Sequence, residues 1–217
     1  MIEINKYIDH TNLKATATED DILELCKEAI EYQFFSVCVN SAYVPLVKKN
    51  LAGSEVKVCS VVGFPLGAMS TEAKVFETRK ALKDGADEID MVINIGEVKS
   101  RNFQKVEKEI AAIKEALGDK VLKVILETCY LSPQEIVTAC EIAVKAGADF
   151  VKTSTGFGTD GAKMENIEHM KKAVNGKAKI KASGGIKNLD TALSFIEAGV
   201  ERIGTSSGVS IVKELQK

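Results

Sequence analysis

Three segments of the chain repeat one pattern: Gly85-Ala-Asp-Glu-Ile-Asp90, Gly147-Ala-Asp-Phe-Val-Lys152 and Gly199-Val-Glu-Arg-Ile-Gly204. Glycine enters the left-handed backbone region at no steric cost, so each of these glycines is predicted to end a helix. A short turn follows each glycine and leads directly into a strand. Helix–turn–strand units that recur along a chain are typical of a parallel sheet whose strands are joined by helices.

Short apolar runs mark eight candidate strands, at residues 7–10, 35–39, 57–61, 88–93, 122–127, 150–153, 179–182 and 202–204. Helical patterns lie between them, and two begin with recognisable capping sequences, Thr18-Glu-Asp-Asp21 and Ser132-Pro-Gln-Glu135. Eight such units in 217 residues predict a (β/α)8, or TIM, barrel that forms a single domain over residues 1–217. A doubly wound parallel sheet is the alternative that the pattern leaves open.

The composition excludes several classes of protein. Apolar residues make up 45% and charged residues 28%, and the formal net charge is −2, which argues against a general nucleic-acid binder or a polybasic membrane anchor. The five cysteines are odd in number and never spaced as C-x-x-C, and the two histidines lie far apart, so neither a disulfide framework nor a metal site is expected. We find no secretory leader pattern and no run of 18 apolar residues, so we expect a cytoplasmic protein.

The repeat also places charged residues inside the predicted barrel. The fifth residue after the glycine is Asp90, Lys152 or Gly204, and the same count from Gly118 and Gly176 gives Lys123 and Lys181. If the turns are equal in length, these five positions lie at similar heights in their strands. Their sequence neighbours are apolar and face the helices, so the charged side chains are predicted to point inward. The carboxyl ends of barrel strands are where such enzymes build their active sites.

Two inward lysines and a carboxylate are suited to Schiff-base chemistry, in which a neutral lysine amine attacks a carbonyl carbon. Repulsion between two ammonium groups about 4 Å apart is ~4 kcal/mol at an effective dielectric constant near 20. That energy corresponds to about three pKa units, enough to bring one lysine near neutrality. Any lysine that Asp90 holds should stay charged. A purely structural ion-pair network is the alternative, and Lys123, Lys179 and Glu127 could belong to it.

Two donor-rich loops follow the last two predicted strands. They are Lys181-Ala-Ser-Gly-Gly-Ile186 and Gly204-Thr-Ser-Ser-Gly208. Glycine-rich loops let backbone N–H groups close around an anion, and barrels commonly bind phosphate after strands seven and eight. Gly156-Phe-Gly-Thr-Asp-Gly161 matches G-x-G-x-x-G, but no acidic residue ends the next strand, so we interpret it as a loop beside Lys152 and not as a dinucleotide site.

Five stretches of the chain resemble the deoxyribose-phosphate aldolase family: Ile8-Asp-His-Thr11, Glu88-Ile-Asp-Met-Val-Ile-Asn94, Phe150-Val-Lys-Thr-Ser-Thr-Gly156, Lys181-Ala-Ser-Gly-Gly-Ile186 and Gly204-Thr-Ser-Ser207. The resemblance implies a class I aldolase without metal or cofactor. It would reversibly cleave 2-deoxy-D-ribose 5-phosphate to acetaldehyde and D-glyceraldehyde 3-phosphate, in deoxyribonucleotide catabolism. It also implies a homo-oligomer, with a homodimer favoured, and small phosphorylated sugars and aldehydes as substrates, with no nucleic-acid or membrane partner.

The family's functional residues carry over onto matching positions. By this resemblance Lys152 forms the Schiff base, Asp90 and Lys181 transfer protons, and Lys181 lowers the pKa of Lys152. The substrate and its phosphate would be held by Cys38, Thr155, Gly156, Gly184, Gly185, Lys187, Gly204, Ser206 and Ser207.

The chain departs from the family pattern at three places. Lys187 stands where many members have Arg, which gives a point-charge phosphate contact in place of a bidentate one. Phe157 stands where some relatives have Lys, and the tail at residues 212–217 lacks the Tyr that some relatives use in proton transfer. Two rival functions stay open: a barrel lyase with the same lysine chemistry on another sugar, and a catalytically silent barrel that binds sugar phosphates.

Overall fold

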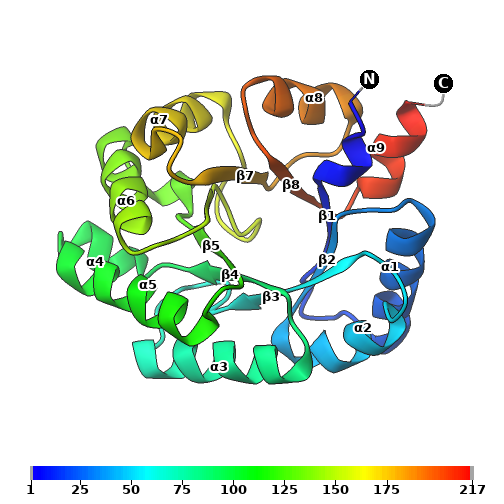
Figure 1. Cartoon of the computed structure of the whole chain (residues 1–217). Helices are drawn as coiled ribbons and strands as arrows, with labels where there is room; N and C mark the ends of the chain where they lie inside the picture. Colours follow the sequence, from blue (N-terminus) through cyan, green and yellow to red (C-terminus); the bar gives the residue numbers. More distant parts are fainter. Residues whose placement is uncertain (1, 216–217) are drawn as a thin grey trace.

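The computed structural model describes residues 2–215, and within them eight parallel strands close into a barrel surrounded by helices (Figure 1). Each strand pairs with its neighbours in chain order, and β1 pairs with β8. This closure confirms the (β/α)8 barrel and excludes the doubly wound sheet. The last two residues of the tail discussed above lie outside the described residues.

All eight observed strands lie within two residues of their predicted bounds. They are β1 Ile8–Asn12, β2 Ser36–Val39, β3 Lys57–Val62, β4 Glu88–Val92, β5 Val121–Ile125, β6 Phe150–Lys152, β7 Lys179–Ser183 and β8 Arg202–Thr205. The α-helices are α1 Glu19–Glu31, α2 Val44–Asn50, α3 Thr71–Asp84, α4 Ile95–Lys99, α5 Phe103–Leu117, α6 Pro133–Lys145, α7 Met164–Val174, α8 Leu189–Glu197 and α9 Gly208–Glu214. Short 3-10 helices cover Ile4–Tyr7 (η1), Ser41–Tyr43 (η2) and Thr128–Tyr130 (η3). Among residues 2–215, no helix is long and apolar enough to cross a membrane.

The predicted helix ends are confirmed. Thr18 and Ser132 each form a complete capping box, at the starts of α1 and α6. Gly85 caps α3 with φ +110°, and Gly147 and Gly199 follow α6 and α8 with φ +86° and +99°. The repeated glycine therefore supplies the left-handed residue that turns the chain from a helix toward the next strand.

The predicted equal height of the inward positions is wrong at two strand pairs. Lys152 of β6 pairs with Ile125 of β5, two residues beyond Lys123. Gly204 of β8 is offset by two residues from Lys181 of β7. A barrel closes only if the register of its strands is staggered, and a stagger of two residues keeps the same side chains facing inward.

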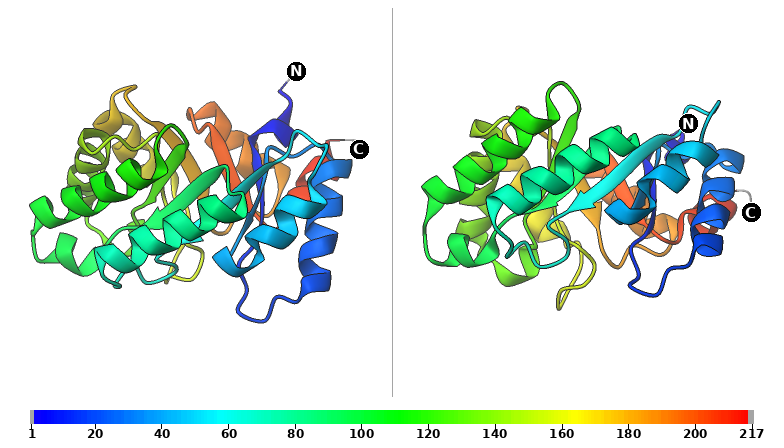
Figure 2. Two further views of the ribbon diagram at one scale, coloured as in Figure 1. Left: turned by 60° about the horizontal axis from the view of Figure 1, so that its bottom comes forward. Right: turned by 90° about the horizontal axis from the view of Figure 1, so that it is seen from below.

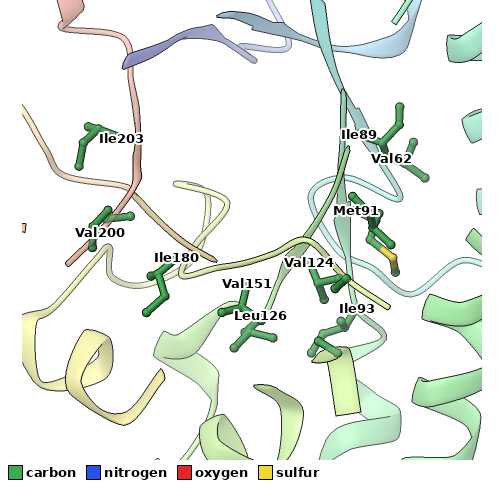
Figure 3. Packing of buried hydrophobic residues seen from close by; sticks show 14 of the residues in the cluster. Val62, Ile89, Met91, Ile93, Val124, Leu126, Val151, Ile180, Val200 and Ile203 are labelled. Carbon is green, nitrogen blue, oxygen red and sulfur yellow. The ribbon is translucent and has the colours of Figure 1, made fainter. Parts of the chain in front are cut away.

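The apolar core lies between the strands and the helices. Figure 3 shows Ile89, Met91, Val124, Val151 and Ile180 pointing away from the barrel axis toward the surrounding helices, and all five are buried. These residues alternate along their strands with the charged residues, which therefore face the barrel interior. A separate small apolar cluster of Leu13, Cys38, Cys59 and Val61 also lies there. Figure 2 shows the loops after β1 and β6 projecting from one end of the barrel, the end to which the strands' carboxyl termini point.

Gly67→Ala is expected to lower the free energy of unfolding by about 3 kcal/mol, as backbone strain adds to steric overlap. Gly67 has φ +67°, and a Cβ there would overlap the carbonyl oxygen of Ile93. Gly53→Ala is the matched control, because Gly53 has φ +84° but nothing lies near its missing Cβ. That variant should lose only the strain, about 1 kcal/mol. Urea denaturation measures both values, and equal losses would show that the contact with Ile93 is unimportant.

Candidate active site

Six charged side chains form a closed ring inside the barrel within residues 2–215. In order they are Asp9, Lys181, Asp90, Lys123, Glu88 and Arg202, which returns to Asp9. The N···O distances are 2.7 Å for Lys181–Asp90, 3.0 Å for Lys123–Asp90, 2.5 Å for Lys123–Glu88, 3.1 Å for Arg202–Glu88 and 2.7 Å for Arg202–Asp9. The signs alternate and each side chain is at most 6% exposed, so the charged ring is buried and neutral.

Lys152 is an additional cation attached to this neutral ring. Its Nζ lies 2.8 Å from Oδ2 of Asp90, and the same oxygen accepts a hydrogen bond from Lys181 at 2.7 Å. With Lys152 charged, four cations face three carboxylates in this buried cluster of the described chain. A buried charge without its own counterion is costly, and loss of one proton from Lys152 would leave the whole cluster neutral.

The members of the charged ring stabilise one another's ionised forms. Burial opposes ionisation of Asp90, but Lys123, Lys152 and Lys181 outweigh it and hold the pKa of this carboxyl well below its usual value. Burial likewise disfavours the charge of Lys181, but Asp9 and Asp90 hold its pKa above the ordinary lysine value. Asp90 therefore contacts both catalytic-lysine candidates, so the expectation that the lysine held by Asp90 stays charged does not separate them. The second carboxylate does: among residues 2–215, Lys181 also pairs with Asp9, whereas Lys152 pairs with Asp90 alone.

Arg202 closes the ring at the amino-terminal end of the barrel, where aromatic rings cover it. Its guanidinium lies 3.4 Å from the ring centroid of Phe35 and 5.5 Å from that of Phe150. Of the three residues considered for a structural network, Lys123 belongs to the ring. Lys179 is exposed and lies 3.4 Å from Glu201, while Glu127 accepts hydrogen bonds from Thr155.

A cavity of about 420 Å³ opens at the carboxyl ends of β1, β6, β7 and β8. Nine of the predicted site residues line it: Lys152, Thr155, Gly156, Gly184, Gly185, Lys187, Gly204, Ser206 and Ser207. Asp90, Lys181 and Cys38 are fully buried and do not line it. Asp90 contacts Lys152, and Lys181 lies against Gly204, so each touches a residue that lines the cavity. Cys38 packs inside the barrel with Leu13 and Cys59.

The end of the cavity at β7 and β8 is built from turns and hydroxyl groups. Gly184 and Gly185 have φ +88° and +80°, so the backbone bends sharply directly after β7. Ser206 and Ser207 bring two hydroxyl groups from the loop after β8, and Lys187 adds a cation. Hydrogen-bond donors that converge in this way are suited to an anionic group such as a phosphate. By contrast, the loop containing Gly156 does not lead directly into a helix, since α7 begins only at Met164.

Several lining residues were missed by sequence reasoning. His10 lines the cavity, and its Nε2 lies 2.7 Å from Oε2 of Glu28. The pKa of His10 is below its ordinary value, because the effect of burial outweighs the opposing effect of Glu28. Ser183 also lines the cavity, and no hydrogen-bond partner for its hydroxyl is found among residues 2–215. The ring members Glu88 and Arg202 were missed as well. Each stands two residues before a position predicted to face inward, so strand alternation was the signal that could have found them.

One set of three potential metal ligands converges within residues 2–215. The Sγ atoms of Cys38 and Cys59 and a carboxylate oxygen of Asp90 lie within 4.8 Å of one another. Three ammonium groups already contact that carboxylate, and Lys123 Nζ lies 3.6 Å from Cys59 Sγ. A divalent cation placed there would face these positive charges, so the donor set does not favour a metal ion.

The charged ring predicts a loss of stability in acid. The pKa values of Asp9 and Asp90 are lower in the folded protein than their ordinary values. The stabilisation of the folded protein by these two ionised carboxylates is therefore complete above the unfolded-state pKa of about 4. It is lost as the pH falls below that value, so the free energy of unfolding should drop by about 2 kcal/mol or more. Urea denaturation at pH 7, 5, 4 and 3 measures this. Asp160→Asn is the control, because Asp160 is exposed and its one ion pair among residues 2–215 is with Lys163, so the acid-induced loss should persist in that variant. A flat profile down to pH 3 would contradict the ring's role.

Comparisons with known proteins agree on one family. The family model described as DeoC/LacD family aldolase matches residues 4–214. The chain is 60% identical over 212 residues to a deoxyribose-phosphate aldolase of Finegoldia magna, covering 98% of this chain and 100% of that protein. It is 56% identical over 216 residues to the enzyme of that name from Thermococcus gammatolerans, covering 98% and 96%. The tetrameric deoxyribose phosphate aldolase structure from Aeropyrum pernix superposes with a TM-score of 0.90 at 32% identity, covering 99% of this chain and 91% of that one.

Proposed function

The chain belongs to the DeoC/LacD family of aldolases, and from this premise we propose that it reversibly cleaves 2-deoxy-D-ribose 5-phosphate to acetaldehyde and D-glyceraldehyde 3-phosphate. One observation carries the proposal. Lys152 adds one positive charge to the buried, otherwise neutral charged ring. Among residues 2–215, no other lysine both contacts that ring and lines the cavity. These are the properties expected of a lysine that forms a Schiff base.

The reaction begins when the neutral amine of Lys152 attacks C1 of the open-chain sugar. The carbinolamine loses water to give a protonated imine, which withdraws electrons from the C2–C3 bond. The C3 hydroxyl then gives up its proton, the C2–C3 bond breaks, and D-glyceraldehyde 3-phosphate leaves. The enamine that remains on Lys152 takes a proton at C2, and water hydrolyses the imine to acetaldehyde and the free amine.

Asp90 and Lys181 are suited to move the protons of this sequence. Oδ2 of Asp90 contacts the Nζ atoms of both Lys152 and Lys181, so one carboxylate oxygen connects the reacting amine to a second ammonium group. Lys181 is held as a cation by two carboxylates, so it supplies a fixed positive charge at the same carboxylate oxygen that the reacting amine contacts. Because neither residue lines the cavity, protons would reach the substrate through Lys152 or through water.

The phosphate would lie at the cavity end formed by Gly184, Gly185, Ser206 and Ser207. These residues and Lys152 line one cavity, so a chain held by its phosphate could present its other end to the amine. Thr155, Gly156, Lys187 and Gly204 would line the space between and around these groups. Cys38 is fully buried and packs with Leu13, which does line the cavity, so its role would be to support that wall.

A coupled assay for glyceraldehyde 3-phosphate tests the proposal. Release from deoxyribose 5-phosphate, much faster than from ribose 5-phosphate, is the expected result. Faster turnover of ribose 5-phosphate would favour a lyase for another sugar. Thermal stabilisation by deoxyribose 5-phosphate without any release would favour a silent binding protein.

The oligomeric state and the location in the cell are also part of the proposal. The relative from Aeropyrum pernix is described as tetrameric, and the family resemblance favours a homodimer for this chain. Light scattering coupled to size-exclusion chromatography distinguishes these assemblies from a monomer. A cytoplasmic location stays a prediction from the sequence.

A further inference from the structure

The loop after β6 forms one wall of the cavity, and its support comes from a residue outside that cavity. Thr155, Gly156 and Phe157 all line the space next to Lys152. Glu127, which follows β5, does not line it and is only 2% exposed. Glu127 therefore contacts the loop from its buried side.

Glu127 holds this loop through several hydrogen bonds to one residue. The backbone N–H of Thr155 donates to both carboxylate oxygens of Glu127, at 3.1 and 3.3 Å, and the Thr155 hydroxyl donates to Oε2. The Thr155 Oγ1 in turn accepts from the backbone N–H of Phe157 at 3.0 Å. A chain of hydrogen bonds thus runs from Glu127 to both ends of the segment 155–157.

The backbone at Glu127 is held in an unfavourable conformation. Its φ is +55°, in the left-handed region that residues with long side chains rarely adopt. Gly158 packs against the same carboxyl group, where a Cβ would crowd Glu127 Cδ and overlap Cys129 Sγ. Non-glycine residues stay in that region only where the surrounding structure imposes it, and they cluster at functional sites.

An aromatic contact holds the tip of the same loop. The ring of Phe157 meets that of Phe64, after β3, edge to face, with centroids 5.4 Å apart and an angle of 88° between the rings. Phe64 packs in turn on the small apolar cluster that contains Leu13 and Val61. The loop is therefore fixed on its buried side by Glu127 and at its tip by Phe64.

We propose that Glu127 is a positioning residue for the sugar phosphate: it fixes residues 155–157 as the cavity wall against which the substrate chain binds. This inference rests on the proposed function. Within residues 2–215, no ion pair is found for the Glu127 carboxylate, although the charge of Lys152 acts on it from a greater distance, so its direct polar contacts in this loop are the hydrogen bonds from Thr155. The pKa of Glu127 is above its ordinary value, because the effect of burial outweighs the opposing effect of the hydrogen bonds from Thr155.

Two substitutions of similar size separate hydrogen bonding from charge. Glu127→Gln keeps an acceptor for the Thr155 N–H and offers an amide donor to the Thr155 hydroxyl, whereas Glu127→Leu removes both. We expect Glu127→Gln to keep its KM for deoxyribose 5-phosphate within about threefold of the parent. Glu127→Leu should raise KM about tenfold, which corresponds to the loss of ~1.4 kcal/mol of binding. In both variants kcat should stay within about threefold, and acetaldehyde with borohydride should label Lys152 at the parent rate, because that step needs no phosphate.

Three results would overturn the proposal: an unchanged KM in Glu127→Leu, an equal loss of kcat in both variants, or an equal rise of KM in both. If Glu127→Leu does not fold, Glu127→Ala takes its place. This substitution also removes both hydrogen-bond acceptors, so KM for deoxyribose 5-phosphate should rise by about the same factor. If acetaldehyde and borohydride fail to label Lys152 in the parent, the proposed function fails instead, and the two failures are thereby distinguished.

Discussion

Lys152→Met is expected to lower kcat for deoxyribose 5-phosphate by at least about 10⁴-fold, the size of effect seen when a catalytic nucleophile is removed. Methionine is close to lysine in length but has no amine to form the imine. Acetaldehyde with borohydride should label Lys152 in the parent and no lysine in the variant. Mass spectrometry of a proteolytic digest identifies the labelled residue.

The same variant should be at least as stable as the parent, and this sets Lys152 apart from an ordinary buried lysine. Removal of one member of a buried ion pair normally costs about 3–5 kcal/mol, because its partner is left unpaired. Here the charged ring remains neutral without Lys152, and Asp90 keeps Lys181 and Lys123. Lys179→Met, at an exposed lysine of β7, is the control and should change neither activity nor stability. A loss of more than about 2 kcal/mol in Lys152→Met would show that Lys152 is part of the ion-pair structure after all.

Much of this site could be predicted because it depends on local rules. Strand alternation makes Asp90, Lys152 and Lys181 face inward, and the loops after β7 and β8 are rich in the donors that a phosphate needs. Alternation survives a stagger of two residues, so the error in register between β5 and β6 did not change which side chains face inward.

The charged ring could not be predicted in the same way, because it depends on which strands meet across the barrel. Asp9 and Arg202 lie 193 residues apart in sequence and form an ion pair only after β8 closes on β1. The position of Lys123 in the ring could not be predicted for the same reason. Sequence alone does not show that its ammonium group pairs with both Glu88 and Asp90. Asp90 and Lys181 do not line the cavity because the charged ring lies deeper in the barrel. Local sequence patterns do not predict this depth.

Asp90→Asn should be the most damaging single change in the barrel interior, because the loss of its charge leaves four cations facing the carboxylates of Asp9 and Glu88 alone. We expect it to lower the free energy of unfolding by about 3–5 kcal/mol. It should also lower kcat by about 10²–10⁴-fold, the usual range for a group in proton transfer. Urea denaturation and the coupled assay measure these two effects.

A double-mutant cycle then tests whether Lys152, the residue proposed to form the imine, lowers the stability of the fold. In an Asp90→Asn background, the charge of Lys152 has lost its only carboxylate contact within residues 2–215, so its removal should be stabilising. Addition of Lys152→Met should therefore stabilise the protein by at least about 1 kcal/mol more than the same substitution does in the parent, a coupling energy within the range measured for residues in direct contact. The double variant would be more stable than Asp90→Asn and as inactive as Lys152→Met. If Lys152→Met destabilises the protein in both backgrounds, Lys152 is not the surplus charge of the cluster, and the reason for assigning it the reactive amine is lost.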